Sequence, residues 1–188
     1  MINTEIVNLW FEKIDVTECD EDLKGYFRLS GVTVHELVEV LGVSKTSVHQ
    51  LINTFNDDMN APNAPTEFPN AFKAQSAGKT SPVVIPLADV VGYMARRLYG
   101  KNAPLRKTYG WVNVFADLTV DEVKTAVAVW QEDSYGVAET CRLLDIGKTK
   151  LYEMLTAGEF PHAYKPLGTT SRFRIPQRDI DAMGAKNG

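Results

Sequence analysis

Apolar residues near the C-terminal end of the chain recur at the spacing of two short helices. They lie on both sides of Gly147, between Leu144 and Leu155, which predicts a helix, a tight turn and a second helix. Cations and hydroxyls occupy the open positions of the second helix, namely Lys148, Thr149, Lys150 and Tyr152. A helix with such a face, and with its N-terminal turn pointing outward, suits a groove lined with phosphates.

The same pattern occurs once more, earlier in the chain. Three blocks recur in the same order, and the pairs are 41–52 with 144–155, 67–73 with 159–165, and 85–90 with 175–180. The first pair aligns without a gap and keeps the Lys-Thr that opens the second helix. Three ordered matches favour an internal duplication over chance similarity.

The order of motifs in each copy resembles a known family. An Ala/Glu-rich helix is followed by Leu-x-Ile/Val-Gly/Ser-x-x-x-Leu/Val-x-x-x-Leu/Ile, then Gly-Glu-Phe-Pro, a strand pair rich in Gly, Ser and Arg, and Ile-Pro-x-x-Asp-Ile. This order resembles the winged helix-turn-helix of excisionases and MerR-like regulators, over residues 136–183 and, less faithfully, 33–94. The resemblance implies that the second helix enters the major groove of DNA. It also implies a hairpin wing that touches the backbone or the minor groove.

These patterns predict a mainly α fold with small β-hairpin wings (α+β), built as two tandem winged helix-turn-helix modules. The expected segments are an acidic helical segment at 1–32, the first module at 33–99, a basic aromatic linker at 100–117 and the second module at 118–184. The helix expected within residues 3–14 should pack on the first module, although its acidic character also suits a partner surface or a DNA mimic. The linker could stack on single strands, or it could be an ordered connection with Trp111 in a core.

Capping signals define several helix ends. Thr33 and Thr119 each precede a Glu by three positions, the pattern of a capping box. Ser44 is expected to cap the second helix of the first copy, and Pro86 to be the first residue of a later helix. The helix after Thr119 carries an apolar stripe that we expect to pack across the second motif; the stripe consists of Val123, Val127 and Trp130.

The charge of the chain is distributed unevenly, although its net value is −4. Residues 1–60 contain eleven Asp and Glu against four Lys and Arg, residues 61–115 contain two against seven, and residues 116–188 contain eleven against nine. Local potential decides where a polyanion binds, so this balance is compatible with basic docking faces. Arg96 and Arg97, near the end of a predicted helix, favour its dipole whether or not they touch phosphate.

We therefore expect a sequence-specific double-stranded DNA-binding protein. The candidate contacts on the second helices are Lys148, Thr149, Lys150 and Tyr152, with Lys45, Thr46, Ser47, His49 and Gln50; those on the wings are Lys165, Ser171, Arg172 and Arg174, with Lys79. The second module should lead, because Asp57 and Asp58 follow the first recognition helix and repel phosphate. For the wing arginines, a solvated edge strand protected by charge is the alternative.

The resemblance implies a regulator from a phage, plasmid or other mobile element, acting as a transcription factor or as an excisionase-like architectural factor. Two alternatives keep the fold. The chain could be the DNA-recognition subunit of a packaging, partition or transfer complex, similar to a small terminase, or a protein-binding adaptor that has lost its affinity for DNA. Besides duplex DNA, the expected partners are a second copy of the chain or an integrase, polymerase or packaging protein.

Other functional classes find little support in the sequence. No apolar run reaches the ~20 residues of a membrane span, and the first residues lack a signal peptide, so we expect a cytoplasmic protein without a membrane partner. Cys19 and Cys141 lack metal-ligand spacing, and Cys141 is expected to be a small buried apolar residue. The three histidines lie in separate elements without a matched acid, so we expect no catalysis, metal or cofactor.

Overall fold

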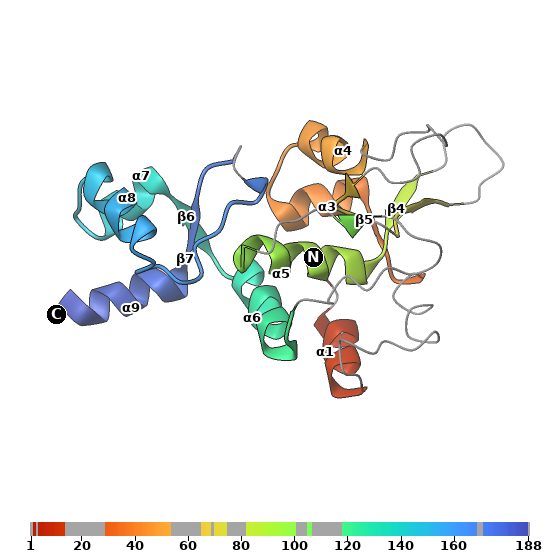
Figure 1. The fold of residues 1–188 in the computed structure, drawn as a ribbon, viewed down its shortest axis with the longest axis horizontal. Helices are drawn as coiled ribbons and strands as arrows, with labels where there is room; N and C mark the ends of the chain where they lie inside the picture. The colour runs from red at the N-terminus through yellow and green to blue at the C-terminus, as the bar shows by residue number, and fades with distance from the viewer. Residues whose placement is uncertain are drawn as a thin grey trace.

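The computed structural model describes residues 2, 4–13, 29–53, 65–68, 70–74, 82–100, 105–106, 118–168 and 171–187. Predictions that concern Cys19, Asp57, Asp58, Lys79 and Trp111 lie outside these ranges. Figure 1 shows two parts, one built around α3 to α6 and a smaller one that contains α7, α8 and α9. The described chain is mainly helical with small antiparallel sheets, which agrees with the α+β class.

The larger part contains most of the elements. They are α1 (Thr4–Lys13), β1 (Val32–Thr33), α3 (Val34–Leu41), α4 (Lys45–Asn53), β2 (Pro65–Thr66), β3 (Phe72–Lys73), β4 (Val83–Ile85), α5 (Leu87–Leu98), β5 (Leu105–Arg106) and α6 (Val120–Gln131). The smaller part contains β6 (Ser134–Gly136), α7 (Val137–Leu143), α8 (Lys148–Thr156), β7 (Arg174–Pro176) and α9 (Gln177–Asn187). The pairing of β2 with β5 was not predicted, because β5 lies in the segment expected to be a linker.

The predicted helix caps are present, with one small shift. Thr33 and Thr119 both form complete capping boxes with the Glu three residues later. The hydrogen bonds from Thr33 lower the pKa of the Glu36 carboxyl, because they favour its charged form. Ser44 Oγ accepts the Ser47 N–H at 3.1 Å. Pro86 is the N-cap of α5 rather than its first helical residue.

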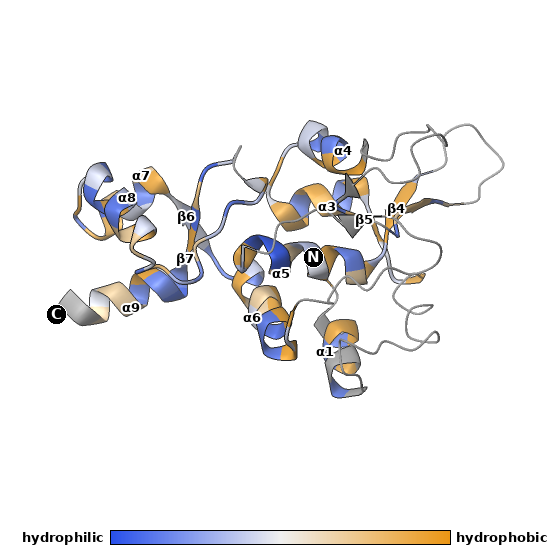
Figure 2. Ribbon diagram, in the orientation of Figure 1, coloured by the Kyte–Doolittle hydropathy of each residue, from blue (hydrophilic) through white to orange (hydrophobic). Residues whose placement is uncertain are grey.

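Helix α5 runs through the core of the larger part. Its side chains are almost all buried, including Val90, Val91, Tyr93 and Met94. Helix α1 packs on this core through Val7, with Ile2 before it, as predicted. The Thr119 helix, α6, was assigned to the wrong core: its apolar stripe packs against α5, and the last member of the stripe, Trp130, contacts Tyr164 of the second motif. Figure 2 shows both hydrophobic and hydrophilic residues on α3 and α6, as expected for helices with one buried face.

The smaller part has a core of its own. It consists of Leu151, Met154, Phe160, Ile175, Ile180 and Met183, with partly buried side chains around them. Cys141 packs against this core as an apolar residue, as predicted, but it is only partly buried. Thr140 on α7 is fully buried. This core closes without a side chain from α6.

Both parts share an order of elements and a strand register. Strand β1 pairs with β4 in the larger part, and β6 pairs with β7 in the smaller part. Thr33, the N-cap of α3, lies opposite Val84, and Gly136, the N-cap of α7, lies opposite Arg174. Val84 also pairs with Phe72, and Arg174 also pairs with Tyr164. Phe72 and Tyr164 correspond in the aligned blocks, and Thr33 with Gly136 and Val84 with Arg174 correspond when the neighbouring blocks are extended.

The turn between the two short helices also has the same shape in both parts. The residue after α3, Gly42, and the equivalent Asp145 both have left-handed backbone angles, with φ of 62° and 51°. The next N–H bonds back to the helix in each turn, from Val43 to Val38 O at 3.3 Å and from Ile146 to Cys141 O at 3.0 Å. Glycine adopts this conformation freely, whereas aspartate tolerates it at some cost.

In each part a buried aspartate on the last helix of the repeat, α5 or α9, binds the residue that follows the Phe-Pro sequence. Asp89 accepts the Asn70 backbone N–H and side-chain amide, each at 2.8 Å. Asp179 accepts the His162 backbone N–H at 2.9 Å and lies 2.7 Å from its Nδ1. The expectation that no histidine has a matched acid was therefore wrong for His162. Sequence spacing could not predict the pair, because its members are 17 residues apart.

Candidate nucleic-acid interface

Helix α8 presents an open face of polar side chains. Lys148, Thr149 and Lys150 are exposed, and Tyr152 is 49% exposed. Lys148 makes no hydrogen bond or ion pair with a described residue. Lys150 lies 4.0 Å from Glu153, but both side chains are more than 60% exposed, so this pair is weak and easily exchanged. The predicted contacts on α8 are thus all exposed, and Thr149 and Tyr152 line one shallow patch.

The start of α8 is also free of a side-chain cap. Gly147 occupies the N-cap position with φ of −74°, and it has no side chain to accept the first N–H groups of the helix. These groups and the positive end of the helix dipole attract anions. Gly147 therefore leaves room and donors at the end of α8 where Lys148 projects. The preceding turn residue, Asp145, is the nearest acidic side chain along the chain.

The comparison with known families concerns this part of the chain. Residues 134–187 match the family model described as a helix-turn-helix domain. This segment is a helix-turn-helix domain. It begins at β6 and ends with α9, so the matched region excludes α6, in agreement with the packing of that helix on α5. No curated protein and no solved structure matches the chain.

Strand β7 and the residues just before it, within the helix-turn-helix domain, carry the two predicted wing arginines. Arg172 is exposed and makes no hydrogen bond or ion pair with a described residue. Arg174 is exposed too, but its guanidinium donates to Ser134 Oγ at 3.1 Å and to Ser134 O at 2.6 Å. Arg174 is thus held by Ser134 of β6, which lies 40 residues away and could not be identified from the sequence around Arg174. Arg172 has no such partner among the described residues.

The other two predicted wing residues of this domain are engaged within the protein. The Lys165 Nζ atom lies 4.6 Å from the centre of the Phe173 ring. Ser171 Oγ accepts the Leu167 N–H at 2.9 Å and donates to Gly168 O at 3.1 Å. The only donor hydrogen of the Ser171 hydroxyl is therefore used to close the loop. The predicted contact Lys79, in the first wing, lies outside the described residues.

In the larger part, α4 follows α3 in sequence as α8 follows α7 in the helix-turn-helix domain. Lys45, Thr46 and Gln50 are exposed, and His49 is half-buried. Ser47 is engaged, because its hydroxyl lies 2.9 Å from Ser44 Oγ and its N–H is capped by the same atom. Helix α4 thus has one exposed cation and a capped start, whereas α8 has two exposed cations and an uncapped one.

Two cations lie in the last turn of α5, as predicted, but their side chains are buried between elements rather than exposed. Arg96 is 5% exposed and donates to Glu67 O at 3.1 Å, and Arg97 lies 2.6 Å from the Glu67 carboxylate. Burial lowers the pKa of Arg96, although a guanidinium stays charged near neutral pH. Two of the seven cations within residues 61–115 therefore do not contribute to the exposed surface.

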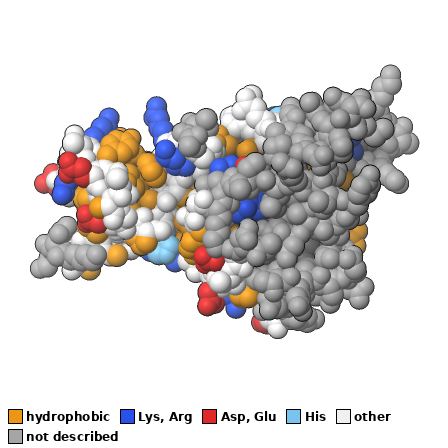
Figure 3. All heavy atoms as spheres, in the orientation of Figure 1, with side chains coloured by type: hydrophobic (Ala, Val, Ile, Leu, Met, Phe, Trp, Pro, Cys, Tyr) orange, Lys and Arg blue, Asp and Glu red, His pale blue; other side chains and the backbone are white. Residues whose placement is uncertain are grey.

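Figure 3 shows how charge is arranged on one face. Where the colours describe this face, Lys and Arg side chains project along the upper edge near α7, α8 and the strands behind them. Asp and Glu side chains lie at the outer end and along the lower edge. The described helices include none long and apolar enough to cross a membrane. Within the described ranges, no three His, Cys, Asp or Glu residues gather as a metal site would require.

Proposed function

We propose that the protein binds double-stranded DNA in a sequence-specific manner and that α8 is its principal recognition helix. The observation that carries this proposal is the exposed, uncapped start of α8 with Lys148 beside it, within a helix-turn-helix domain. Arg172 lies on the strand side and supplies a further phosphate contact. The role we propose is that of a regulator or excisionase-like factor of a phage, plasmid or other mobile element.

We further propose that the two parts descend from one duplicated winged helix-turn-helix module, so that α4 is a second recognition helix. Three features support this proposal: equivalent strand registers, the left-handed turn residue, and the buried carboxylate that binds the residue after the Phe-Pro sequence. One chain would then offer two readers. If both insert on one face of the duplex, their half-sites lie ~10 base pairs apart.

The two recognition helices share their first two side chains and differ beyond them. Lys45 and Thr46 correspond to Lys148 and Thr149, whereas Gln50 corresponds to Glu153. Glutamine suits bidentate contact with adenine, and glutamate accepts from the amino group of cytosine. We therefore expect two related but unequal half-sites rather than a palindrome.

A binding role, rather than catalysis, also fits the pair of His162 and Asp179. The equivalent pair in the larger part is Asn70 and Asp89, and an amide cannot exchange protons as a catalytic histidine does. In both pairs the carboxylate binds a backbone N–H and a side-chain nitrogen of the same residue. We therefore assign His162 a structural role.

The salt dependence of duplex affinity tests the proposal. Binding of the full chain to fragments selected from its parent genome should weaken steeply with salt, with a log-log slope of about 0.9 per neutralised phosphate. Arg172→Ala should flatten the slope by about one unit, and Lys148→Ala should weaken binding more than Lys45→Ala does. Lys124→Ala, which changes an exposed lysine on α6, is the matched control and should change neither quantity.

Two results would overturn these assignments. Salt-insensitive or undetectable duplex binding would favour the adaptor alternative over DNA recognition. A larger loss from Lys45→Ala than from Lys148→Ala would reverse the order of the two helices.

A further inference from the structure

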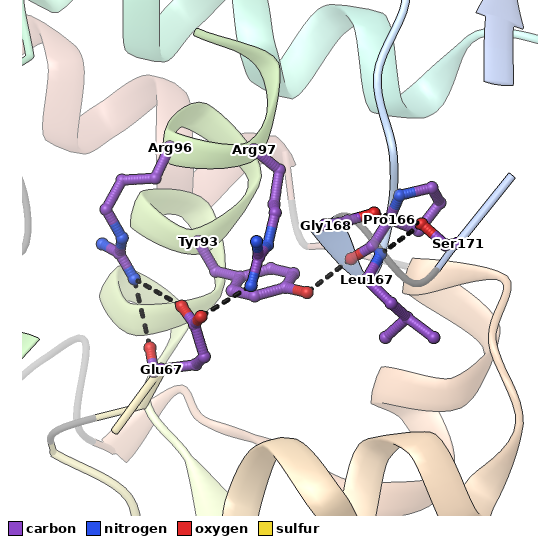
Figure 4. Close-up of polar contacts among 8 residues, drawn as sticks. All are labelled: Glu67, Tyr93, Arg96, Arg97, Pro166, Leu167, Gly168 and Ser171. Carbon is purple, nitrogen blue, oxygen red and sulfur yellow. Dashed lines mark hydrogen bonds and ion pairs between the residues drawn. The ribbon is translucent and has the colours of Figure 1, made fainter. Parts of the chain in front are cut away.

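The loop at 165–168 of the helix-turn-helix domain contacts α5 of the larger part (Figure 4). The Tyr93 hydroxyl donates a hydrogen bond to Pro166 O. Tyr93 is fully buried, and its ring packs against Phe68 with the centroids 5.2 Å apart. Burial raises the pKa of the Tyr93 phenol, which keeps the donating proton in place at neutral pH. A buried donor and a backbone acceptor from different parts of the chain thus satisfy each other.

Arg97 strengthens the same contact from the adjoining turn of α5. Its guanidinium lies 4.9 Å from the centre of the Tyr93 ring and 2.6 Å from the Glu67 carboxylate. Gly168 lies directly against this guanidinium: a Cβ atom at this position would come 2.6 Å from Arg97 Nη1. Gly168 also has φ of 65°, which disfavours any side chain. The arginine and the glycine therefore fit one another closely.

The loop itself is held in a defined shape. The Gly168 N–H bonds to Lys165 O at 3.0 Å, and the Ser171 N–H bonds to Gly168 O at 3.2 Å. The Ser171 hydroxyl closes the loop again through Leu167. These bonds link Gly168 and Leu167 to the neighbouring loop residues, so we expect contacts at Pro166 and Gly168 to restrain the whole loop.

Further contacts between described residues connect the two parts. Tyr164 is buried with the core of the larger part, and its ring centre lies 4.5 Å from that of Trp130. Arg178 pairs with Glu132 at the two-residue connection between α6 and β6. A cleft of about 370 Å³ lies between the parts, and its lining includes Glu39, Leu41, Trp130, Tyr164, Pro166 and Arg174. Among the described residues, the two cores are therefore separate except at Tyr164, and these contacts restrain the relative orientation of the parts.

We propose that Tyr93, Arg97, Pro166 and Gly168 form a clamp that fixes α4 and α8 as one rigid reader with a set half-site spacing. This inference rests on the proposed function, because it assumes that both helices read DNA. Helices α4 and α8 lie along the same side of the molecule in Figure 1, with α6 and α1 on the opposite side. The clamped loop faces protein, so this part of the wing positions the reader and does not enter the minor groove.

A pair of substitutions opens the clamp with little other change. Tyr93→Phe removes the donating hydroxyl and keeps the ring, and Gly168→Ala places a methyl group against Arg97. Their matched controls are Tyr135→Phe, in the core of the helix-turn-helix domain, and Gly158→Ala. Gly158 has φ of 75°, and a Cβ atom added there would have no neighbour within 4 Å, so its substitution reproduces the backbone strain without touching the clamp.

The first readout needs no DNA. Spin labels are attached at Thr46→Cys and Thr149→Cys in a chain with Cys19→Ser and Cys141→Val, and the distance between the labels is measured by electron paramagnetic resonance. We expect one narrow distance distribution in the parent chain and in both controls. The double clamp variant should give a broad distribution while melting as a folded protein. A broad distribution in the parent, or an unchanged one in the clamp variant, would overturn the proposal.

The second readout uses a duplex selected for binding by the parent chain, with 5 base pairs inserted between its two half-sites. Half a helical turn moves one half-site to the opposite face, so the parent should lose at least roughly tenfold in affinity. The clamp variant should lose less than about threefold, because its readers can adjust independently. An equal loss in both proteins contradicts the clamp. A parent that binds no duplex contradicts the proposed function instead, and the distance measurement still decides whether the clamp exists.

Discussion

The contact between His162 and Asp179 allows a sharp test of the proposed duplication, because the larger part contains the same contact with asparagine. His162→Asn should be tolerated: the backbone N–H still bonds to Asp179, and an amide replaces the ring donor. In the equivalent pair, Asn70 spans the gap to Asp89 at 2.8 Å, against 2.7 Å for His162 Nδ1 and Asp179. His162→Ala keeps the backbone bond but removes the side-chain donor.

The size of each effect follows from burial. Asp179 is 3% exposed and needs its hydrogen-bond donors, whereas the His162 side chain is 27% exposed, so water can replace part of the lost bond. A hydrogen bond to a charged group contributes about 1.5–3 kcal/mol, and the lower end applies to a partly exposed donor. His162→Ala should therefore lower the free energy of unfolding by about 1.5 kcal/mol, and His162→Asn by less than about 0.5 kcal/mol. For a domain as small as residues 134–187, this loss should lower the melting temperature of the alanine variant by about 6–12 °C.

Thermal and urea unfolding, followed by circular dichroism, measure both variants against the parent chain. Asp179→Ala is the reference for losing the acceptor, and it should be the most damaging change of the three. If asparagine at 162 proves as harmful as alanine, the two carboxylate contacts are not interchangeable, and the structural equivalence argued for the two parts loses its best support.

Three further predictions concern the caps, the turns and alkaline pH. Ser44→Ala should cost about 1 kcal/mol of stability in denaturant unfolding, and no loss would mean that the cap is not formed in solution. Gly42→Ala should cost about 1 kcal/mol, whereas Asp145→Gly, the reverse exchange at the equivalent turn, should cost nothing; equal losses would contradict the shared left-handed turn. Burial raises the pKa of Tyr93 and Tyr164, so the folded state favours their neutral forms; their contribution to stability is complete below the unfolded pKa of about 10 and is lost as pH rises above it. Melting temperatures should fall accordingly as the pH is raised through about 10 and beyond, and less steeply in Tyr93→Phe.

Features that depend on neighbours along the chain could be predicted from the sequence. The capping boxes at Thr33 and Thr119 need only a hydroxyl and a carboxylate three positions later, and both form. The helix-turn-helix pattern around Gly147 likewise follows from the spacing of apolar residues. The side chains of α8 were placed on an open face for the same reason, since helical periodicity decides which positions point away from a core.

Features that depend on distant partners could not be predicted in this way. Arg96 and Arg97 looked like surface cations because their partner, Glu67, lies 29 and 30 residues away. The apolar stripe of α6 indicated that the helix is buried but not which core it joins. The sequence shows that a buried cation needs an acidic partner and that an apolar stripe needs a core. The tertiary fold decides which residues supply them.

The candidate site shows the same division. Helical spacing and charge identified Lys148 and Arg172, which have no partner among the described residues, but they also pointed to Ser171, whose hydroxyl closes a loop. Nothing in the sequence indicated the contact between Tyr93 and Pro166, because a buried tyrosine in an apolar helix resembles any other core residue. Serine and tyrosine serve structure or binding equally well, so their surroundings decide their role.

Hydroxyl-radical footprinting on a selected duplex tests the central claim most directly, since it reports where the intact chain covers the sugar-phosphate backbone. Two unequal protected patches, on one face of the duplex and about 10 base pairs apart, are the result we predict. In the parent chain one patch should be protected more strongly than the other, and Lys148→Ala should weaken that patch most. A single patch from the full chain, unchanged by Lys45→Ala, would contradict the claim that one polypeptide carries two DNA readers.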